Sequence, residues 1–137
     1  QIAKAGLSDR VELLGRRTRE QIAELLRNTD VVVTPSVPTK SGKREGIPVV
    51  LMEAMASGVA VVASGISGIP ELVDDQVSGL LTPPRDAAAL ADALEKLQRD
   101  PELRQRLGKA GREKVLREFD LTTNARLLIE RFLSISR

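Results

Sequence analysis

The sequence predicts an α/β protein in which a parallel sheet is flanked by helices, and three observations predict it. Short runs rich in valine and leucine alternate with segments of helical periodicity, which is the pattern of parallel strands joined by crossover helices. The 137 residues are 42% hydrophobic and 29% charged, the ordinary balance of a folded domain. A chain of this length suits one domain with its own core. We therefore expect residues 1–137 to form a single domain whose last part, 86–137, is helical.

The first third of the chain predicts a strand, a helix and a second strand. Val11–Leu14 is a short apolar run that favours a strand. Thr18 is followed three residues later by Gln21, a spacing that predicts a helix start with a capping box, and Asn28 can end that helix. Val31–Val33 is too short and too apolar for anything but a buried strand.

The middle of the chain predicts one more helix and two more strands. Pro48 suits the first position of a helix because its missing N–H would be unpaired there. The helix should run to about Ser57, with Gly58 as a left-handed stop. Val59–Ala63 predicts a third buried strand and Leu80–Leu81 a fourth.

From Asp86 onward the pattern is helical throughout. One stripe recurs at i, i+3, i+4 and i+7, and its members are Leu90, Ala93, Leu94 and Leu97. Asp100-Pro101 predicts the start of a second helix, with a cap followed by a first-position proline. A last amphipathic helix is predicted by Leu121, Ala125, Leu128 and Phe132.

Composition excludes several classes of function. The chain has no cysteine and no histidine, so it has no disulfide, no thiolate or imidazole metal site, and no cysteine or histidine catalysis. It has no tyrosine or tryptophan, and its formal net charge is only +2. We therefore expect no nucleic-acid partner.

The chemistry is predicted where the second strand passes through a loop into the middle helix. In an open parallel sheet, ligands bind at the carboxyl ends of the strands. The loop carries Lys43, Arg44 and Glu45, and Gly46 lets the backbone approach a ligand closely. A helix start presents unpaired N–H groups, so this turn predicts an anion or phosphate site.

Glu53 lies in a helix that is otherwise apolar, so we expect it to be buried on most sides. Removing an ionised carboxylate from water costs several kcal/mol unless it is well paired. Glu53 is too deep in the helix for much stabilisation by the helix dipole. The residues alone leave two explanations open, a ligand contact or a structural salt bridge to Lys43 or Arg44.

A second turn, after the third strand, carries further candidates. Ser67 could cap the short helix that follows, or it could contact a ligand, and Gly68 could approach the same ligand. Glu71 follows Pro70 at that helix start, where a cap or dipole role is the expected one.

The string Glu-Gly-Ile-Pro followed by Leu-Met-Glu-Ala-Met-Ala at 45–56 resembles the signature of retaining GT-B glycosyltransferases of family four. The strings at 30–36, 67–73 and 79–81 are similar to those of bacterial exopolysaccharide transferases of the colanic-acid and amylovoran type. The resemblance covers nearly the whole chain. It implies a partial Rossmann-like sheet that belongs to the carboxy-terminal, donor-binding half of a GT-B fold.

The resemblance also implies roles by position. Glu45 matches the glutamate that faces the hydroxyls of the donor sugar near the reacting carbon. The resemblance therefore implies that Glu45 is the catalytic residue. Glu53 matches the glutamate that accepts hydrogen bonds from the nucleotide ribose. Gly46, Ile47 and Pro48 match the turn that touches the sugar and phosphates of the donor.

The activity implied is transfer of a sugar from a nucleotide diphosphate to a hydroxyl acceptor with retention, in polysaccharide or glycolipid biosynthesis. It implies a nucleotide sugar as substrate and no cofactor or metal. It also implies an enzyme that acts in the cytoplasm, at the inner face of the membrane, with peripheral membrane contact. An amino-terminal acceptor domain and two strand-helix units of the family are missing, so we expect this chain alone to be inactive. Alternatives are a sugar-nucleotide epimerase of related fold and a non-catalytic binding module.

The missing units leave the sheet incomplete. In the strand order 3-2-1-4-5-6, they belong between Val11–Leu14 and Val31–Val33. We therefore expect an exposed sheet edge, a rearranged sheet, or self-association through that edge.

Overall fold

A computed structural model describes residues 1–38 and 46–135, and in this part of the chain it contains a three-stranded parallel sheet. The strands are β1 (Val31–Thr34), β2 (Ala60–Ser64) and β3 (Leu80–Thr82), in the order β1-β2-β3. Val31 lies beside Ala60, and further along β2 Val62 lies beside Leu80. The predicted α/β class with a parallel sheet is confirmed.

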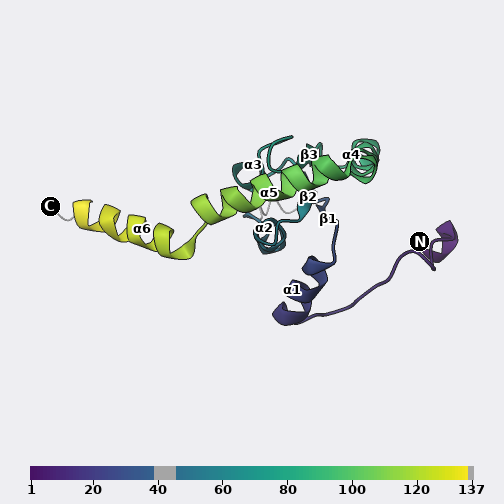
Figure 1. The fold of residues 1–137 in the computed structure, drawn as a ribbon, viewed down its shortest axis with the longest axis horizontal. Coiled ribbons are helices and arrows are strands. Elements are labelled where there is room, and N and C mark those ends of the chain that lie inside the picture. Colours follow the sequence, from purple (N-terminus) through teal and green to yellow (C-terminus); the bar gives the residue numbers. More distant parts are fainter. Residues whose placement is uncertain (39–45, 136–137) are drawn as a thin grey trace.

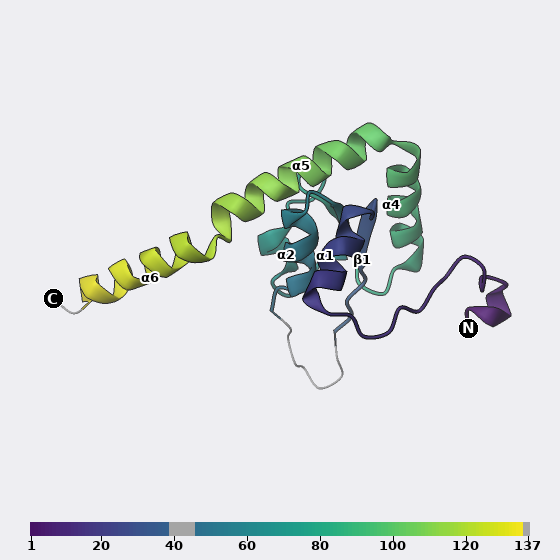
Figure 2. The same ribbon diagram turned by 60° about the horizontal axis from the view of Figure 1, so that its bottom comes forward.

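Helices cover both faces of the sheet (Figures 1 and 2). In chain order they are α1 (Arg19–Arg27), α2 (Val49–Ala56), α3 (Ile69–Leu72), α4 (Ala87–Arg99), α5 (Pro101–Glu118) and α6 (Leu121–Ile135), with a short 3-10 helix at Ala3–Ala5. Alternate residues of β2 divide the core, because Val61 packs with α2 on one face while Val62 packs with α4 and α5 on the other. All five residues of β2 are buried, so β2 is the centre of the fold.

The predicted first strand is wrong. Val11–Leu14 has no regular structure, and Leu13 is 83% exposed. The physical reason is that a strand needs a neighbour for its N–H and C=O groups, and the described residues supply none there. The segment instead runs away from the sheet toward the amino terminus (Figure 2).

The second predicted strand forms as β1, but it is not buried. All four of its residues are only half-buried, whereas β2 beside it is fully buried. Among the described residues, β1 pairs with β2 along one edge and with nothing along the other. The expected open edge is therefore present.

Most of the predicted helix ends are confirmed. Thr18 accepts a hydrogen bond from the Gln21 N–H, and the Gln21 side chain accepts one from the Thr18 N–H, which completes the capping box. Asp100 accepts a hydrogen bond from the Leu103 N–H at 2.8 Å at the start of α5. Gly58 has a φ of +77° just after α2, as a left-handed stop requires. Pro48 differs by one position, because it precedes α2 as its N-cap.

Helix α5 crosses the sheet and fixes the elements beneath it. A Cβ on Gly108 would lie 2.1 Å from the backbone oxygen of Gly58, so α5 approaches the turn before β2 at backbone distance. Arg112 Nη1 donates to the Ala56 carbonyl at the end of α2 at 2.5 Å. These contacts leave no room for a side chain at Gly108.

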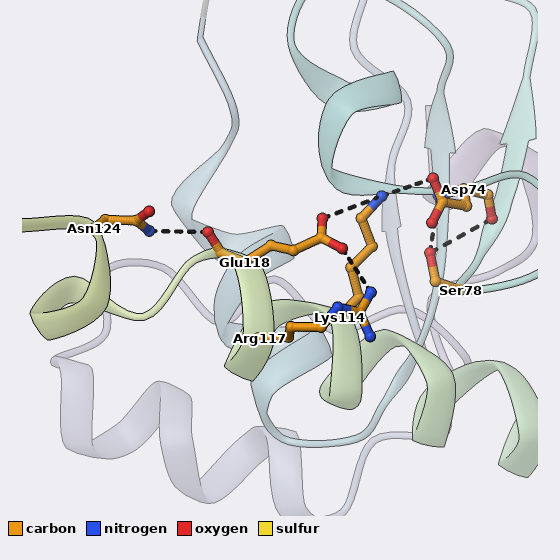
Figure 3. A network of polar contacts seen from close by, with 6 residues as sticks. All are labelled: Asp74, Ser78, Lys114, Arg117, Glu118 and Asn124. Atoms are coloured by element: carbon orange, nitrogen blue, oxygen red, sulfur yellow. Dashed lines mark hydrogen bonds and ion pairs between the residues drawn. The ribbon is translucent and has the colours of Figure 1, made fainter. Parts of the chain in front are cut away.

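A buried lysine joins α5 to the turn that precedes β3 (Figure 3). Lys114, whose side chain is 7% exposed, lies 2.7 Å from Asp74 Oδ1 and 3.9 Å from Glu118 Oε2. Asp74 is fixed in turn, because its N–H donates to Ser78 Oγ at 2.9 Å. Beyond Glu118, whose carbonyl accepts from the Asn124 side chain, the chain enters α6.

Helix α6 projects from the body of the protein (Figure 1). All of its described residues are exposed, and several large apolar side chains lie on it, among them Leu121, Leu128, Ile129, Phe132 and Leu133. In the part of the chain that the structure describes, no helix combines the length and apolar character needed to cross a bilayer.

Candidate functional site

The turn that leads into α2 lies at the carboxyl edge of the sheet. Gly46 is exposed, and Ile47 and Pro48 are half-buried. No described side chain caps the start of α2, where Pro48 is the N-cap. The first N–H groups of a helix have no partner within the helix, and the described side chains supply none at this turn.

The turn after β2 packs directly against it. A Cβ on Gly68 would lie 2.9 Å from Ile47 Cγ1 and 3.4 Å from the Ile47 nitrogen. The structure therefore brings together Gly46, Ile47 and Gly68, which belong to two separate loops of the sequence. Both loops follow the carboxyl ends of neighbouring parallel strands, the place where open sheets bind ligands.

Ser67 does not cap the helix that follows. The N-cap position of α3 belongs to Gly68, and the described residues give it no side-chain cap. Ser67 itself has a φ of +53°, a left-handed conformation that is uncommon for a residue other than glycine. The cap interpretation is therefore wrong, and the ligand-contact interpretation of Ser67 stays a prediction. Glu71 lies exposed in the first turn of α3.

Glu53 lies on the side of α2 that faces α1, and it is half-buried rather than buried on most sides. It lines a hollow of about 430 Å³ between the two helices, together with Arg19, Glu20 and Ile22. The difference from the prediction arises because α1 leaves space beside α2. Within the described part of the chain Glu53 makes no ion pair.

The wall of this hollow that α1 forms carries two charged side chains, Arg19 and Glu20, beside apolar ones such as Ile22. The hydrogen bond with Thr18 is the main cause that lowers the pKa of Glu20, with help from its own backbone N–H and from Arg19. Glu20 therefore stays ionised at neutral pH. Sequence reasoning missed Arg19 and Glu20 as neighbours of Glu53, because only the packing of α1 beside α2 brings them together.

Three predicted site residues, Lys43, Arg44 and Glu45, lie outside the described residues. Their roles, like the salt bridge proposed for Glu53, stay predictions.

A further polar group lies at the same edge of the sheet. Thr34 Oγ1, at the end of β1, is buried without a hydrogen-bond partner among the described residues. No group of three or more Asp or Glu in the described part could hold a metal ion.

The fold is that of an α/β protein with a parallel sheet and two glycine turns at its carboxyl edge. The comparisons with known proteins give its family. The family model described as glycosyl transferases group 1 matches residues 1–114. This chain belongs to that family.

Relatives in exopolysaccharide synthesis are among the most similar proteins. The amylovoran biosynthesis glycosyltransferase AmsK of Erwinia amylovora is 43% identical over 129 residues, which are 94% of this chain and 32% of the relative. A proposed colanic acid biosynthesis glycosyltransferase of Escherichia coli, WcaL, is 44% identical over 83% of this chain and 28% of its own length. The predicted resemblance to this group is confirmed.

Solved structures give the same fold. The chain is similar to sucrose-phosphate synthase from Thermosynechococcus elongatus, with a TM-score of 0.85, 34% identity, and coverage of 98% of this chain and 32% of that one. It is also similar to Anabaena HepE in complex with UDP, with a TM-score of 0.87, 29% identity, and coverage of 97% and 35%. These neighbours are GT-B glycosyltransferases. The chain spans about a third of the length of the proteins that it matches.

Proposed function

We propose that this chain is the donor-binding part of a retaining glycosyltransferase that transfers a sugar from a nucleotide diphosphate to a hydroxyl acceptor. The observation that carries the proposal is the contact between Ile47 and Gly68, at the start of α2, which no described side chain caps. The structures of Anabaena HepE with UDP and with UDP-glucose support a nucleotide sugar as the ligand. The relatives support a role in polysaccharide or glycolipid biosynthesis.

The turn can stabilise the departing diphosphate. When the bond to the sugar breaks, negative charge develops on the phosphate oxygens, and amide donors already aimed at that position lower the barrier. The exposed backbone at Gly46 leaves space for a phosphate to approach, since, chain neighbours aside, no described atom lies within 4 Å of the position that a Cβ would take. The start of α2 adds a favourable dipole. This step needs no metal.

Two carboxylates orient the donor. Glu53 is half-buried in an open hollow and makes no ion pair within the described residues. Its carboxylate can therefore accept hydrogen bonds from both hydroxyls of a ribose. Each hydrogen bond to a charged group contributes roughly 1.5–3 kcal/mol. Glu45, one residue before the turn, is proposed to face the hydroxyls of the transferred sugar. Lys43, Arg44 and Ser67 are proposed as further donor contacts.

The remaining parts of the reaction lie outside this chain. Because it spans about a third of its relatives, we propose that an amino-terminal domain binds the acceptor. We propose that the reaction takes place in the cytoplasm, at the inner face of the membrane. The 137-residue chain alone should bind nucleotide weakly and show no turnover, and detectable transfer by the chain alone would refute this point.

Calorimetry tests the donor site. UDP, GDP and ADP are titrated into the chain, and Glu53→Gln should weaken binding of the preferred nucleotide about tenfold, roughly 1.4 kcal/mol. Glu71→Gln is the matched control, since Glu71 is an exposed glutamate on the next helix. Equal affinity of the Glu53→Gln variant and the unchanged chain would remove Glu53 from the ribose. Absence of binding by all three nucleotides would contradict the donor site itself.

A further inference from the structure

A small pocket lies at the carboxyl edge of the sheet, on the face opposite the turn at 46–48. Ser64 and Thr82 are the last residues of β2 and β3 and are partners in the strand register, so their side chains share one face of the sheet. Val62, two residues before Ser64, packs with α4 and α5, so this is the face that α4 covers. Ile47 packs with the core on the other face. The pocket is therefore separate from the proposed donor site.

The size of the pocket limits what it can hold. Its volume is about 180 Å³, and an apolar cavity of about 150 Å³ is known to hold benzene, so the space suits one six-membered ring and is too small for a nucleotide. Its walls come from the ends of the three strands and the first turn of α4, so the described chain forms the pocket by itself. The apolar lining residues are Pro35, Val37, Pro83, Ala87 and Leu90.

Two buried hydroxyl groups line the same pocket. Ser64 is 2% exposed and Thr82 is 6% exposed. In the described part of the chain the Ser64 hydroxyl makes no hydrogen bond. Thr82 Oγ1 donates to the Ala63 carbonyl at 3.5 Å, which is long for a hydrogen bond. Buried polar groups are nearly always hydrogen-bonded, so a ligand with polar groups can supply the partner that Ser64 lacks.

The rim of the pocket carries one charge of each sign. Arg85 Nη2 donates to the Pro38 carbonyl at 3.3 Å, and Asp86 Oδ1 accepts from the Ala89 N–H at 2.9 Å. Among the described residues neither Arg85 nor Asp86 makes an ion pair. The guanidinium keeps further N–H groups to donate, and the second carboxylate oxygen of Asp86 remains an acceptor.

We propose that this pocket binds one ring of a neutral sugar. A site built to bind an anion presents hydrogen-bond donors, and a site built to bind a cation presents acceptors, whereas this pocket presents both and its two formal charges cancel. A sugar ring matches this lining, because its hydroxyls both donate and accept while its C–H groups are apolar. The ring belongs to the carbohydrate that the proposed transfer extends, and only this last assignment rests on the proposed function.

Amide chemical shifts of the 137-residue chain test the pocket. Methyl glycosides of glucose, galactose, mannose and N-acetylglucosamine are titrated to about 100 mM, and at least one should cause saturable changes at 64, 82 and 85–87 with a dissociation constant on the order of 10 mM. Inorganic phosphate should cause no saturable change there. The proposal is overturned if no glycoside gives saturable changes, if the changes lie elsewhere, or if phosphate saturates these residues.

Substitutions in the pocket identify the polar contacts. Ser64→Ala should weaken glycoside binding about three- to tenfold, the loss of one neutral hydrogen bond, and should leave the melting temperature unchanged because this hydroxyl has no described partner. Arg85→Gly should also weaken binding, and its φ of +64° suits glycine. Asp86→Asn keeps a capping oxygen for α4 and should weaken binding too. Lys96→Ala, at an exposed position of α4, is the control and should bind as the original does.

Binding of UDP separates this proposal from the proposed donor site. Gly46→Ala should weaken UDP binding and leave glycoside binding unchanged, and Ser64→Ala should do the reverse. UDP binding without glycoside binding would refute the sugar pocket and leave the donor site intact, whereas glycoside binding without UDP binding would support the pocket and contradict the donor site. Unchanged glycoside binding by all three pocket variants would overturn the assignment of this pocket.

Discussion

Gly108→Ala is the sharpest test of how the fold is held together. The added Cβ would lie 2.1 Å from the Gly58 oxygen and 3.0 Å from the Gly58 carbonyl carbon. Ordinary carbon–oxygen contacts are about 3.3–3.6 Å, so α5 or the turn must move by more than about 1 Å. Both contacting atoms are backbone atoms, and a backbone cannot rotate aside as a side chain can.

The magnitude follows from two opposing effects. Overpacking a core typically costs about 1–3 kcal/mol, and a backbone clash belongs at the upper end or beyond. Replacing glycine by alanine within a helix raises the free energy of unfolding by about 1 kcal/mol, because alanine has the higher helix propensity. We therefore expect a net loss of about 2 kcal/mol or more in the free energy of unfolding. At this chain length, that loss lowers the melting temperature by roughly 5–10 °C.

Thermal and urea unfolding followed by circular dichroism measure the effect. Gly111→Ala provides a graded comparison on the same helix, since its Cβ would lie 3.0 Å from the Ser78 oxygen and 3.4 Å from Met55 Cε. Its loss should be smaller. Lys109→Ala, at an exposed position of α5, should change stability by less than about 0.5 kcal/mol. A Gly108→Ala protein as stable as the original would refute the backbone contact.

Further predictions concern the lysine network, the last helix and the donor turn. Lys114→Met should lower the free energy of unfolding, measured with urea, by about 1 kcal/mol. Asp74→Ala should lower it more, because the buried Lys114 ammonium then keeps only Glu118, 3.9 Å away, as a partner. The reverse order of the two losses would contradict the network. Hydrogen bonds from the Thr123 N–H and hydroxyl lower the pKa of Asp120, so its cap stabilises α6 above its unfolded-state pKa and is lost as pH falls through the lowered value. Asp120→Asn should therefore remove this pH dependence from amide exchange in α6, and an unchanged profile would exclude Asp120 as its source. Gly46→Ala should leave the melting temperature unchanged, since its Cβ meets no described atom within 4 Å apart from its chain neighbours, yet weaken nucleotide binding. A loss of stability would contradict this open position of Gly46.

Much of the fold could be predicted from the sequence because its signals are local. Capping by Thr18 and Asp100 depends on residues three positions apart, and the left-handed stop at Gly58 depends on one residue. The wrong strand at Val11–Leu14 shows the limit of such signals. Its apolar pattern is compatible with a strand, but a strand exists only where a neighbour supplies hydrogen bonds.

The features of the candidate site also divide into those that the sequence predicts and those that depend on packing. The proximity of Gly46 and Gly68 could be expected, because both turns follow parallel strands and must share an edge of the sheet. The half-exposure of Glu53 could not be expected, because it depends on how far α1 stands from α2. Similarly, nothing in the local sequence around Gly108 indicates that it contacts Gly58.

Mapping bound UDP on the 137-residue chain tests the donor site most directly. Amide chemical shifts are recorded by nuclear magnetic resonance during a UDP titration. The account predicts that the largest saturable changes occur at Gly46, Ile47 and Gly68, with smaller ones around Glu53 and the first turn of α1. Saturable binding that leaves the two glycine turns unchanged would contradict it.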